Sequence, residues 1–241
     1  MQINIIFHNI AEDNEELTNK YSVNRWYLIR LIEDIKSKLI SMENRPELCL
    51  YFDDGYSSFY NVVLPMIDDI PFPITLTVIL DKLDTAGYIT TEQLINISNS
   101  RVSIASHGVS HAALAVYREN QLQDIALIGK YENTPFGQGE PLSADQIKYQ
   151  FIESKKKLES IINKPIDEFV LPYGLYNSRV VEIFKELDLY KYLSTCDIGI
   201  DNGQILKPRF LISNDTQPAE ACEKLLHLFT NYKNENSREN I

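Results

Sequence analysis

The sequence predicts an α/β fold in which parallel strands are covered by helices and close, or nearly close, into a barrel. Short apolar or β-branched runs alternate with amphipathic stretches at helical spacing through the first five or six expected elements. The chain has 241 residues, of which 44% are hydrophobic, and this is enough to bury a sizeable core in one domain.

The elements follow from local patterns, taken in chain order. An apolar run at 3–7 predicts the first strand, and the polar, acidic residues 11–20 predict a loop. Apolar residues at three- and four-residue spacing then predict an amphipathic helix at 24–42. The same criteria predict a strand at 48–52, a helix at 59–67 strained by Pro65, a strand at 74–80, a short helix capped by Thr90 or Thr91, strands at 101–105, 190–195 and 206–212, and helices at 177–187 and 218–232.

Composition argues against several classes of protein. The net charge of -11 disfavours nucleic acid or an anionic membrane as a partner, and no apolar run approaches the length of a membrane span. Cys49, Cys196 and Cys222 are odd in number and widely spaced, so we expect reduced core residues and no disulfide framework. The first residues lack the features of a secretory signal, and a cytoplasmic location is therefore expected.

Two adjacent carboxylates, Asp53 and Asp54, follow the expected strand at 48–52 and precede Gly55. Neighbouring residues within a strand face opposite sides, so both acids can serve one site only where the strand ends. Two close like charges raise the pKa of one group unless a cation lies between them, which favours a bound metal. The alternative is a solvated Asp-Asp-Gly turn.

Two histidines, His107 and His111, follow the expected strand at 101–105. Residues four apart on a helical turn share a face at about 5–6 Å, and imidazole suits zinc, cobalt, nickel or iron. The alternative is a coincidental pair on a surface turn. Because Asp54 also follows a buried strand, we expect the three residues to hold one metal with positions left for water and substrate, as in catalytic sites.

Three segments resemble the first three motifs of the polysaccharide deacetylases, the NodB-homology domains of carbohydrate esterase family 4. They are Phe-Asp-Asp-Gly at 52–55, Ile-Ala-Ser-His-Gly-Val-Ser-His at 104–111 and Phe-Val-Leu-Pro-Tyr-Gly at 169–174. Residues 142–159 resemble the helix that precedes the third motif, and Ile6-Phe7-His8 resembles the family's frequent first strand ending in Tyr-His. The resemblance covers roughly residues 1–213.

This resemblance implies a distorted (β/α) barrel of about seven parallel strands, of the NodB or glycoside hydrolase-deacetylase type. It implies hydrolysis of an N-acetyl group from an amino sugar, so the expected partner is an N-acetylated carbohydrate. The expected cofactor is one divalent metal, with Zn²⁺ placed ahead of Co²⁺, Ni²⁺ or Fe²⁺.

The resemblance also implies a role for individual residues. Asp54, His107 and His111 would hold the metal. Asp53 would be the general base that takes a proton from the attacking water. The backbone N–H of Tyr173, next to Pro172, would hold the oxyanion, although a plain strand-ending turn is the alternative at that motif.

The sequence departs from the family pattern at the arginine and at the general acid. Val170 and Leu171 replace the arginine that many members carry before the third-motif proline, so the residue that orients Asp53 is not identified. His227 has the letters of the family's later acid motif but lies within an expected helix. We therefore prefer His8 as the acid, and an enzyme without a dedicated acid is the remaining alternative.

Arg209, on the expected last strand, has two alternative roles. It could face the site and bind a carboxylate or phosphate, or it could form a structural salt bridge.

We expect a single domain over residues 1–232, with an inserted loop at 115–141 and a frayed polar tail at 233–241. The loop is longer than usual in the family, and loops of this length are often lids or specificity elements. Its tyrosines could stack on sugar rings, and an ordinary folded-back loop is the alternative. Its aromatic and glycine residues are Tyr117, Tyr131, Phe136, Gly137 and Gly139.

These observations together favour a metal-dependent deacetylase of an amino sugar in a polysaccharide or glycan precursor. The first alternative is a cyclic amide or ureide hydrolase on the same barrel. The second is a glycan-binding barrel without turnover, suggested by the missing acid and arginine. The oligomeric state is left open.

Overall fold

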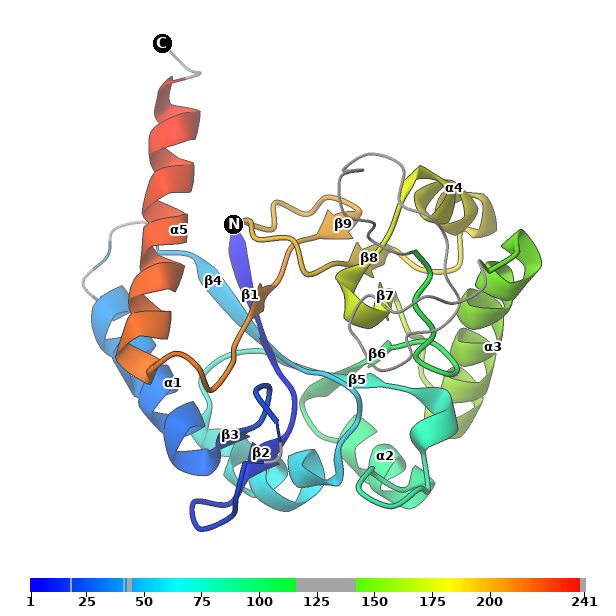
Figure 1. Ribbon diagram of the computed structural model, residues 1–241, viewed down its shortest axis with the longest axis horizontal. Coiled ribbons are helices and arrows are strands. Elements are labelled where there is room, and N and C mark those ends of the chain that lie inside the picture. The colour runs from blue at the N-terminus through cyan, green and yellow to red at the C-terminus, as the bar shows by residue number, and fades with distance from the viewer. Residues whose placement is uncertain (18, 41, 43–44, 116–141, 239–241) are drawn as a thin grey trace.

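The computed structural model describes the chain except for residues 18, 41, 43–44, 116–141 and 239–241, which are drawn as a grey trace (Figure 1). Within the described residues, eight parallel strands form one curled sheet in the order β10-β1-β4-β5-β6-β7-β8-β9. The strands are β1 (Gln2–Phe7), β4 (Glu47–Phe52), β5 (Ile74–Val78), β6 (Val102–Ser106), β7 (Glu168–Val170), β8 (Tyr192–Ser194), β9 (Leu206–Lys207) and β10 (Phe210–Leu211).

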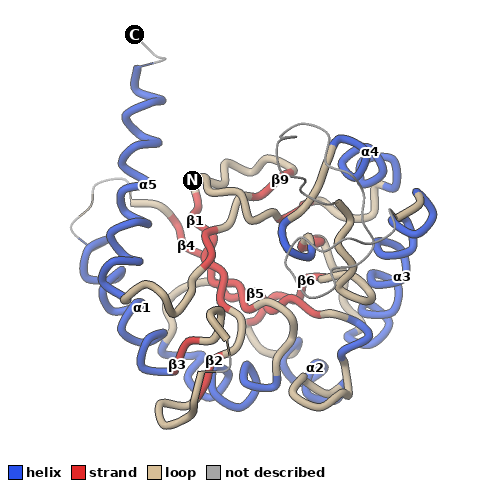
Figure 2. Tube along the Cα trace, viewed as in Figure 1, coloured by secondary structure: helices blue, strands red, loops and turns tan. Residues whose placement is uncertain are grey.

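Helices surround this sheet, as the ring of blue segments around the red strands shows (Figure 2). They are α1 (Arg25–Ile40), α2 (Thr91–Ser98), α3 (Ala144–Ile162), α4 (Ser178–Leu187) and α5 (Pro218–Arg238). The prediction of a parallel (β/α) barrel is therefore confirmed, with eight strands where about seven were expected. None of the helices in the described part of the chain combines the length and hydropathy that a membrane crossing requires.

Side chains along a strand alternate between two faces of the sheet, and each face contributes to a different buried cluster. In β4, Leu48, Leu50 and Phe52 join the large apolar core that also includes residues of the surrounding helices. The intervening Cys49 and Tyr51 belong to a separate small cluster with residues of β6 and β7. Asp53 lies two residues after Tyr51 and so points to the same face as Cys49 and Tyr51, which directs its carboxylate into the barrel.

Several local details differ from the predictions. The expected helix at 59–67 is a π-helical turn at Phe59–Val63 followed by a 3-10 turn at Leu64–Asp69. Pro65 accounts for this change, because a proline has no N–H to continue an α-helical ladder. The expected loop at 11–20 lies between β2 (Ile10–Ala11) and β3 (Val23–Asn24), which form a small parallel sheet.

The C-terminal region contains two further differences. The expected strand at 206–212 is divided into β9 and β10, which pair with opposite edges of the sheet. Helix α5 continues to Arg238, so the polar residues after Lys233 extend a helix where we expected a frayed tail. It packs beside α1, and its end projects beyond the rest of the molecule (Figure 1).

Candidate active site

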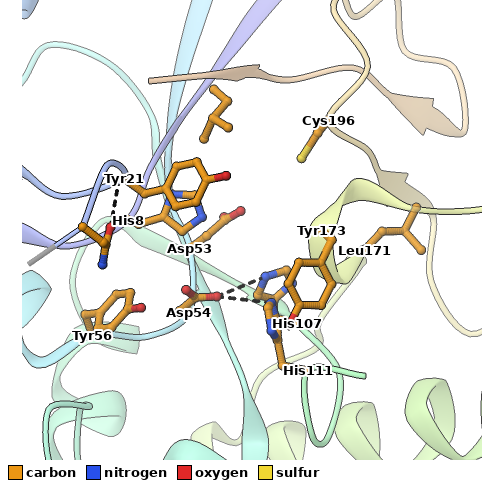
Figure 3. A pocket seen from close by; sticks show the side chains of 12 residues that line it. His8, Tyr21, Asp53, Asp54, Tyr56, His107, His111, Leu171, Tyr173 and Cys196 are labelled. Atoms are coloured by element: carbon orange, nitrogen blue, oxygen red, sulfur yellow. Dashed lines mark hydrogen bonds and ion pairs between the residues drawn. The ribbon is translucent and has the colours of Figure 1, made fainter. Parts of the chain in front are cut away.

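The polar residues singled out from the sequence lie at the carboxyl ends of neighbouring strands. His8 follows β1, Asp53 and Asp54 follow β4, and His107 follows β6. Parallel strands end at the same mouth of a barrel, so residues far apart in the sequence meet there. These four side chains line one cavity of about 260 Å³ (Figure 3).

Asp54, His107 and His111 direct three potential ligand atoms toward one point. Oδ1 of Asp54 lies 3.4 Å from Nε2 of His107 and 3.4 Å from Nε2 of His111, the two contacts dashed in Figure 3. The ligand atoms of all three residues lie within 4.8 Å of one another. A tetrahedral cation with bonds of about 2.0–2.1 Å separates its ligands by about 3.3–3.4 Å, so the two separations of 3.4 Å from Asp54 Oδ1 fit a metal such as Zn²⁺.

Hydrogen bonding around the cluster supports the same interpretation. Nδ1 of His107 lies 2.8 Å from the carbonyl oxygen of Val170, which can only accept a hydrogen bond. The neutral imidazole therefore presents its Nε2 lone pair to Asp54. Oδ1 of Asp54 is buried and has no hydrogen-bond partner within the described chain. Two such electron-rich atoms repel each other unless a proton or a cation lies between them, so this donor set fits a divalent metal.

The backbone is strained where the site is built. Asp54, His111 and Tyr173 all have positive φ values, of 76°, 57° and 60°. Among the described residues, the other non-glycine residues with positive φ are all Asp or Asn, which tolerate the left-handed region. Histidine and tyrosine do not gain that local compensation, and such strain concentrates at functional sites.

Burial and mutual charge shift the pKa values of the three residues. Burial and the charge of His107 lower the pKa of His111 to about 4, so His111 is neutral near pH 7. Burial alone would lower the pKa of His107, but the interactions with Asp54 and Asp53 outweigh burial and raise this pKa above its ordinary value. Burial opposes ionisation of Asp54, yet the two imidazoles hold its pKa well below the usual range. A proton and a metal therefore compete for the cluster mainly at His107.

Asp53 is 3% exposed and lies beside this cluster without joining it. Its Oδ1 accepts a hydrogen bond from Thr77 Oγ1 at 3.1 Å and one from Arg209 Nη1 at 2.9 Å. Burial would raise the pKa of Asp53, but the charges of Arg209, His107 and His8 hold it below its usual value. Asp53 is consequently a carboxylate at neutral pH and can accept a proton.

His8 lies across the pocket from the histidine pair, on the same side as Tyr21 (Figure 3). The ring centroids of His8 and Tyr21 are 5.3 Å apart, and Nδ1 of His8 is buried without a hydrogen-bond partner in the described structure. His227, the alternative acid, is exposed on α5, where its Nε2 lies 2.9 Å from Nδ2 of Asn231. Of the two histidines, only His8 lines the pocket.

Pro172 and Tyr173 form a 3-10 turn with Gly174 directly after β7. Pro172 is buried, whereas Tyr173 is 42% exposed and lines the pocket. The Tyr173 and His111 ring centroids are 4.5 Å apart. This turn therefore forms the wall of the cavity beside the histidine pair.

The cavity is also lined by residues that the sequence analysis did not assign to the site, namely Asn19, Tyr21, Tyr56, Leu171, Cys196 and Leu211. Cys49 and Cys222 are buried as expected, but the prediction of a core position is wrong for Cys196, which is partly exposed in the pocket. Tyr56 directly follows the Asp-Asp-Gly motif, and this position in the sequence could have predicted its place at the site. Asn19 and Tyr21 reach the mouth through the fold of the β2–β3 region, which local patterns do not predict. The expected loop residues Tyr117, Tyr131, Phe136, Gly137 and Gly139 lie outside the described residues.

A curled sheet of parallel strands with an acid pair and a histidine pair at one mouth has the NodB deacetylase barrel fold. Residues 42–192 match the family model described as polysaccharide deacetylase, and the chain belongs to this family.

Relatives and solved structures agree with this assignment. A poly-beta-1,6-N-acetyl-D-glucosamine N-deacetylase of Escherichia coli K12 is 25% identical over 198 residues, which is 73% of this chain and 29% of that protein. The Streptococcus pyogenes deacetylase PplD in complex with acetate superposes with a TM-score of 0.70 at 22% identity, over 94% of this chain and 96% of that one. A de-N-acetylase from Aggregatibacter actinomycetemcomitans gives a TM-score of 0.70 at 20% identity, over 89% and 96% of the two chains.

Proposed function

We propose that this protein is a metal-dependent hydrolase that removes N-acetyl groups from an amino sugar in a polysaccharide or glycan precursor. The observation that carries the proposal is the position of the buried Asp53 carboxylate beside the donor cluster Asp54, His107 and His111. A base adjacent to a metal site, but not part of it, is the arrangement that amide hydrolysis by an activated water requires. The family membership supports the same reaction class.

Asp54, His107 and His111 are the residues that would hold the metal. When bound, a divalent ion supplies a Lewis acid that polarises a carbonyl oxygen and lowers the pKa of water. Asp53 accepts the proton of the water that attacks the acetyl carbonyl carbon. The pKa of Asp53 lies below its usual value, so its carboxylate is in the accepting form at neutral pH.

Collapse of the tetrahedral intermediate needs a proton on the leaving nitrogen. His8 lines the pocket across from the histidine pair and is the proposed donor. The backbone N–H of Tyr173 is the proposed donor to the oxyanion, and one such preorganised donor contributes about 3–4 kcal/mol. The products are acetate and a free amino sugar. The place of His8 in the pocket favours turnover over a barrel that only binds a glycan, because a histidine there could serve as the acid that the later motif lacks.

Aromatic side chains at the pocket support a carbohydrate substrate. Tyr21, Tyr56 and Tyr173 line the cavity. Tyr56 also stacks on Tyr88, with ring centroids 5.1 Å apart. Tyrosine combines an apolar face with a polar hydroxyl, which suits a sugar ring that has C–H bonds on its face and hydroxyls at its edge. The Escherichia coli relative is named for an N-acetyl-D-glucosamine polymer, and such a polymer is a first substrate to test.

An acetate-release assay tests the proposal. Protein stripped with a chelator is reloaded separately with Zn²⁺, Co²⁺, Ni²⁺ or Fe²⁺ and incubated with β-1,6-linked N-acetylglucosamine oligomers, chito-oligomers or a nucleotide-linked N-acetyl amino sugar. We expect metal-dependent acetate release from at least one substrate. Turnover of a cyclic ureide without acetate release would instead favour the cyclic amide hydrolase. Stoichiometric metal with no turnover of any of these would overturn the proposal.

The general acid can be tested with two matched substitutions. His8→Gln is expected to lower kcat about 10²-fold, because glutamine fits the space but cannot supply a proton at neutral pH. Metal content should stay at the wild-type level, since His8 is not in the donor cluster. His227→Gln, on the surface of α5, serves as the control and should leave kcat unchanged. Equal activity of both variants would exclude His8 as the acid.

A further inference from the structure

The segment from Leu206 to Leu211 joins the two edges of the curled sheet. β9 pairs with β8, through Leu206 beside Leu193 and Lys207 beside Ser194. Only two residues later, β10 pairs with β1. Pro208 and Arg209 therefore bridge the seam where the barrel closes, and this position directs Arg209 into the interior.

Arg209 is 1% exposed, and contacts from several parts of the chain fix its guanidinium. Nε donates a hydrogen bond to the carbonyl oxygen of Thr195 at 3.0 Å. Nη1 donates a hydrogen bond to Oδ1 of Asp53 at 2.9 Å. The guanidinium carbon lies 5.0 Å from the centroid of the Tyr51 ring, within the range of a cation–π contact. An arginine held at three points has little freedom to leave Asp53.

The two carboxylate oxygens of Asp53 differ in the hydrogen bonds that they accept. Thr77 and Arg209 both donate to Oδ1. No described residue donates a hydrogen bond to Oδ2, although Asp53 lines the cavity. The carboxylate is thus held through one oxygen, and the other is available to a water in the pocket.

We propose that Arg209 is the positioning residue that orients Asp53 for proton transfer. This inference rests on the proposed deacetylase function and goes beyond it, because it identifies the part of the chain that holds the base. The two residues just before Pro172, Val170 and Leu171, are apolar and carry no charge that could pair with Asp53. In this protein the cation comes from the seam at the end of the barrel.

Removal of the Arg209 side chain has two separable consequences. A misplacement of about 1 Å at a reacting group can cost about 10²-fold in rate. Loss of one partner also leaves a buried charge without compensation, which destabilises the fold. The experiment must therefore distinguish an effect on orientation from a general loss of stability.

Lys207→Met is the matched control for stability. Lys207 lies two residues away in the same segment and forms a partly buried ion pair with Glu168, with Nζ and Oε2 3.2 Å apart. It lines a different cavity, of about 510 Å³, and does not line the active-site pocket. Its substitution breaks an ion pair of the closing segment without touching Asp53.

The experiment compares the wild type, Arg209→Lys, Arg209→Ala and Lys207→Met, all metal-loaded. Metal content, the thermal unfolding midpoint, and kcat and KM for acetate release are measured for each. We expect Arg209→Lys and Arg209→Ala to bind metal, to keep KM within about twofold and to lose about 10²-fold in kcat. Added guanidinium should restore part of the kcat of Arg209→Ala, and Lys207→Met should lower the unfolding midpoint while keeping the wild-type kcat.

The results distinguish failure of the positioning role of Arg209 from failure of the proposed deacetylase function. Wild-type kcat in either folded, metal-loaded Arg209 variant would overturn the positioning role alone. A loss of kcat in Lys207→Met as large as in the Arg209 variants would also overturn it, because the effect would then follow stability. If Arg209→Ala does not fold, Arg209→Lys decides by the same criterion. A wild-type protein that releases no acetate would overturn the proposed function and this inference with it.

Discussion

Asp53→Asn is expected to abolish acetate release while the protein still binds its metal. Asparagine has nearly the same shape as aspartate, but its amide cannot accept the proton of the attacking water. General base catalysis contributes about 10²–10⁴ in rate, so we expect kcat to fall by about 10³-fold. Asp53 does not belong to the donor cluster of Asp54, His107 and His111, and the metal content should not change.

Metal analysis and acetate release measured on the same preparations check this prediction. Asp188→Asn is a suitable control, because Asp188 caps α4 in the left-handed conformation, which asparagine also tolerates. The control should keep both metal and turnover. Substantial turnover by Asp53→Asn would show that another group takes the proton.

His107→Ala is expected to lose the metal and, with it, all turnover. The substitution removes one of three candidate ligands, and it leaves the buried carbonyl oxygen of Val170 without the donor 2.8 Å away. Loss of an outer-shell partner alone lowers metal affinity by about 10- to 100-fold, and loss of a ligand should cost more.

Dialysis against buffered Zn²⁺ followed by metal analysis measures this effect. His227→Ala is the control, because its side chain is exposed on α5 and does not belong to the cluster. Wild-type metal content in His107→Ala would remove His107 from the metal site. The two variants should therefore differ in metal content: His107→Ala should be inactive because it has lost the metal, whereas Asp53→Asn should be inactive with the metal still bound.

The strands and the donor cluster were predictable because their signals are local. The apolar run before Asp53 and the run before His107 each identify a strand. The ends of parallel strands meet at one mouth, so the positions of the polar residues in the fold follow from the strand assignments. The same reasoning identified His8 at the end of the first strand.

The partner of Asp53 could not be predicted in this way. Arg209 lies 156 residues from Asp53 in the sequence, and its position depends on where the last strand crosses from one sheet edge to the other. Local periodicity predicts one strand at 206–212 and contains no information about that crossing. The irregular turns at 59–69 were missed for a related reason, because apolar spacing does not distinguish an α-helix from π and 3-10 turns.

The crossing between β9 and β10 also has a consequence for biosynthesis. β1 is synthesised before β10, with which it pairs on one side, so that edge stays open until β10 has left the ribosome. An open strand edge invites pairing with other chains. A nascent chain that ends before Leu206 contains every proposed metal ligand and the base, yet it lacks both the strand that covers this edge and the arginine that contacts Asp53. The catalytic mouth can therefore be assembled only after the segment from Leu206 to Leu211 has been synthesised.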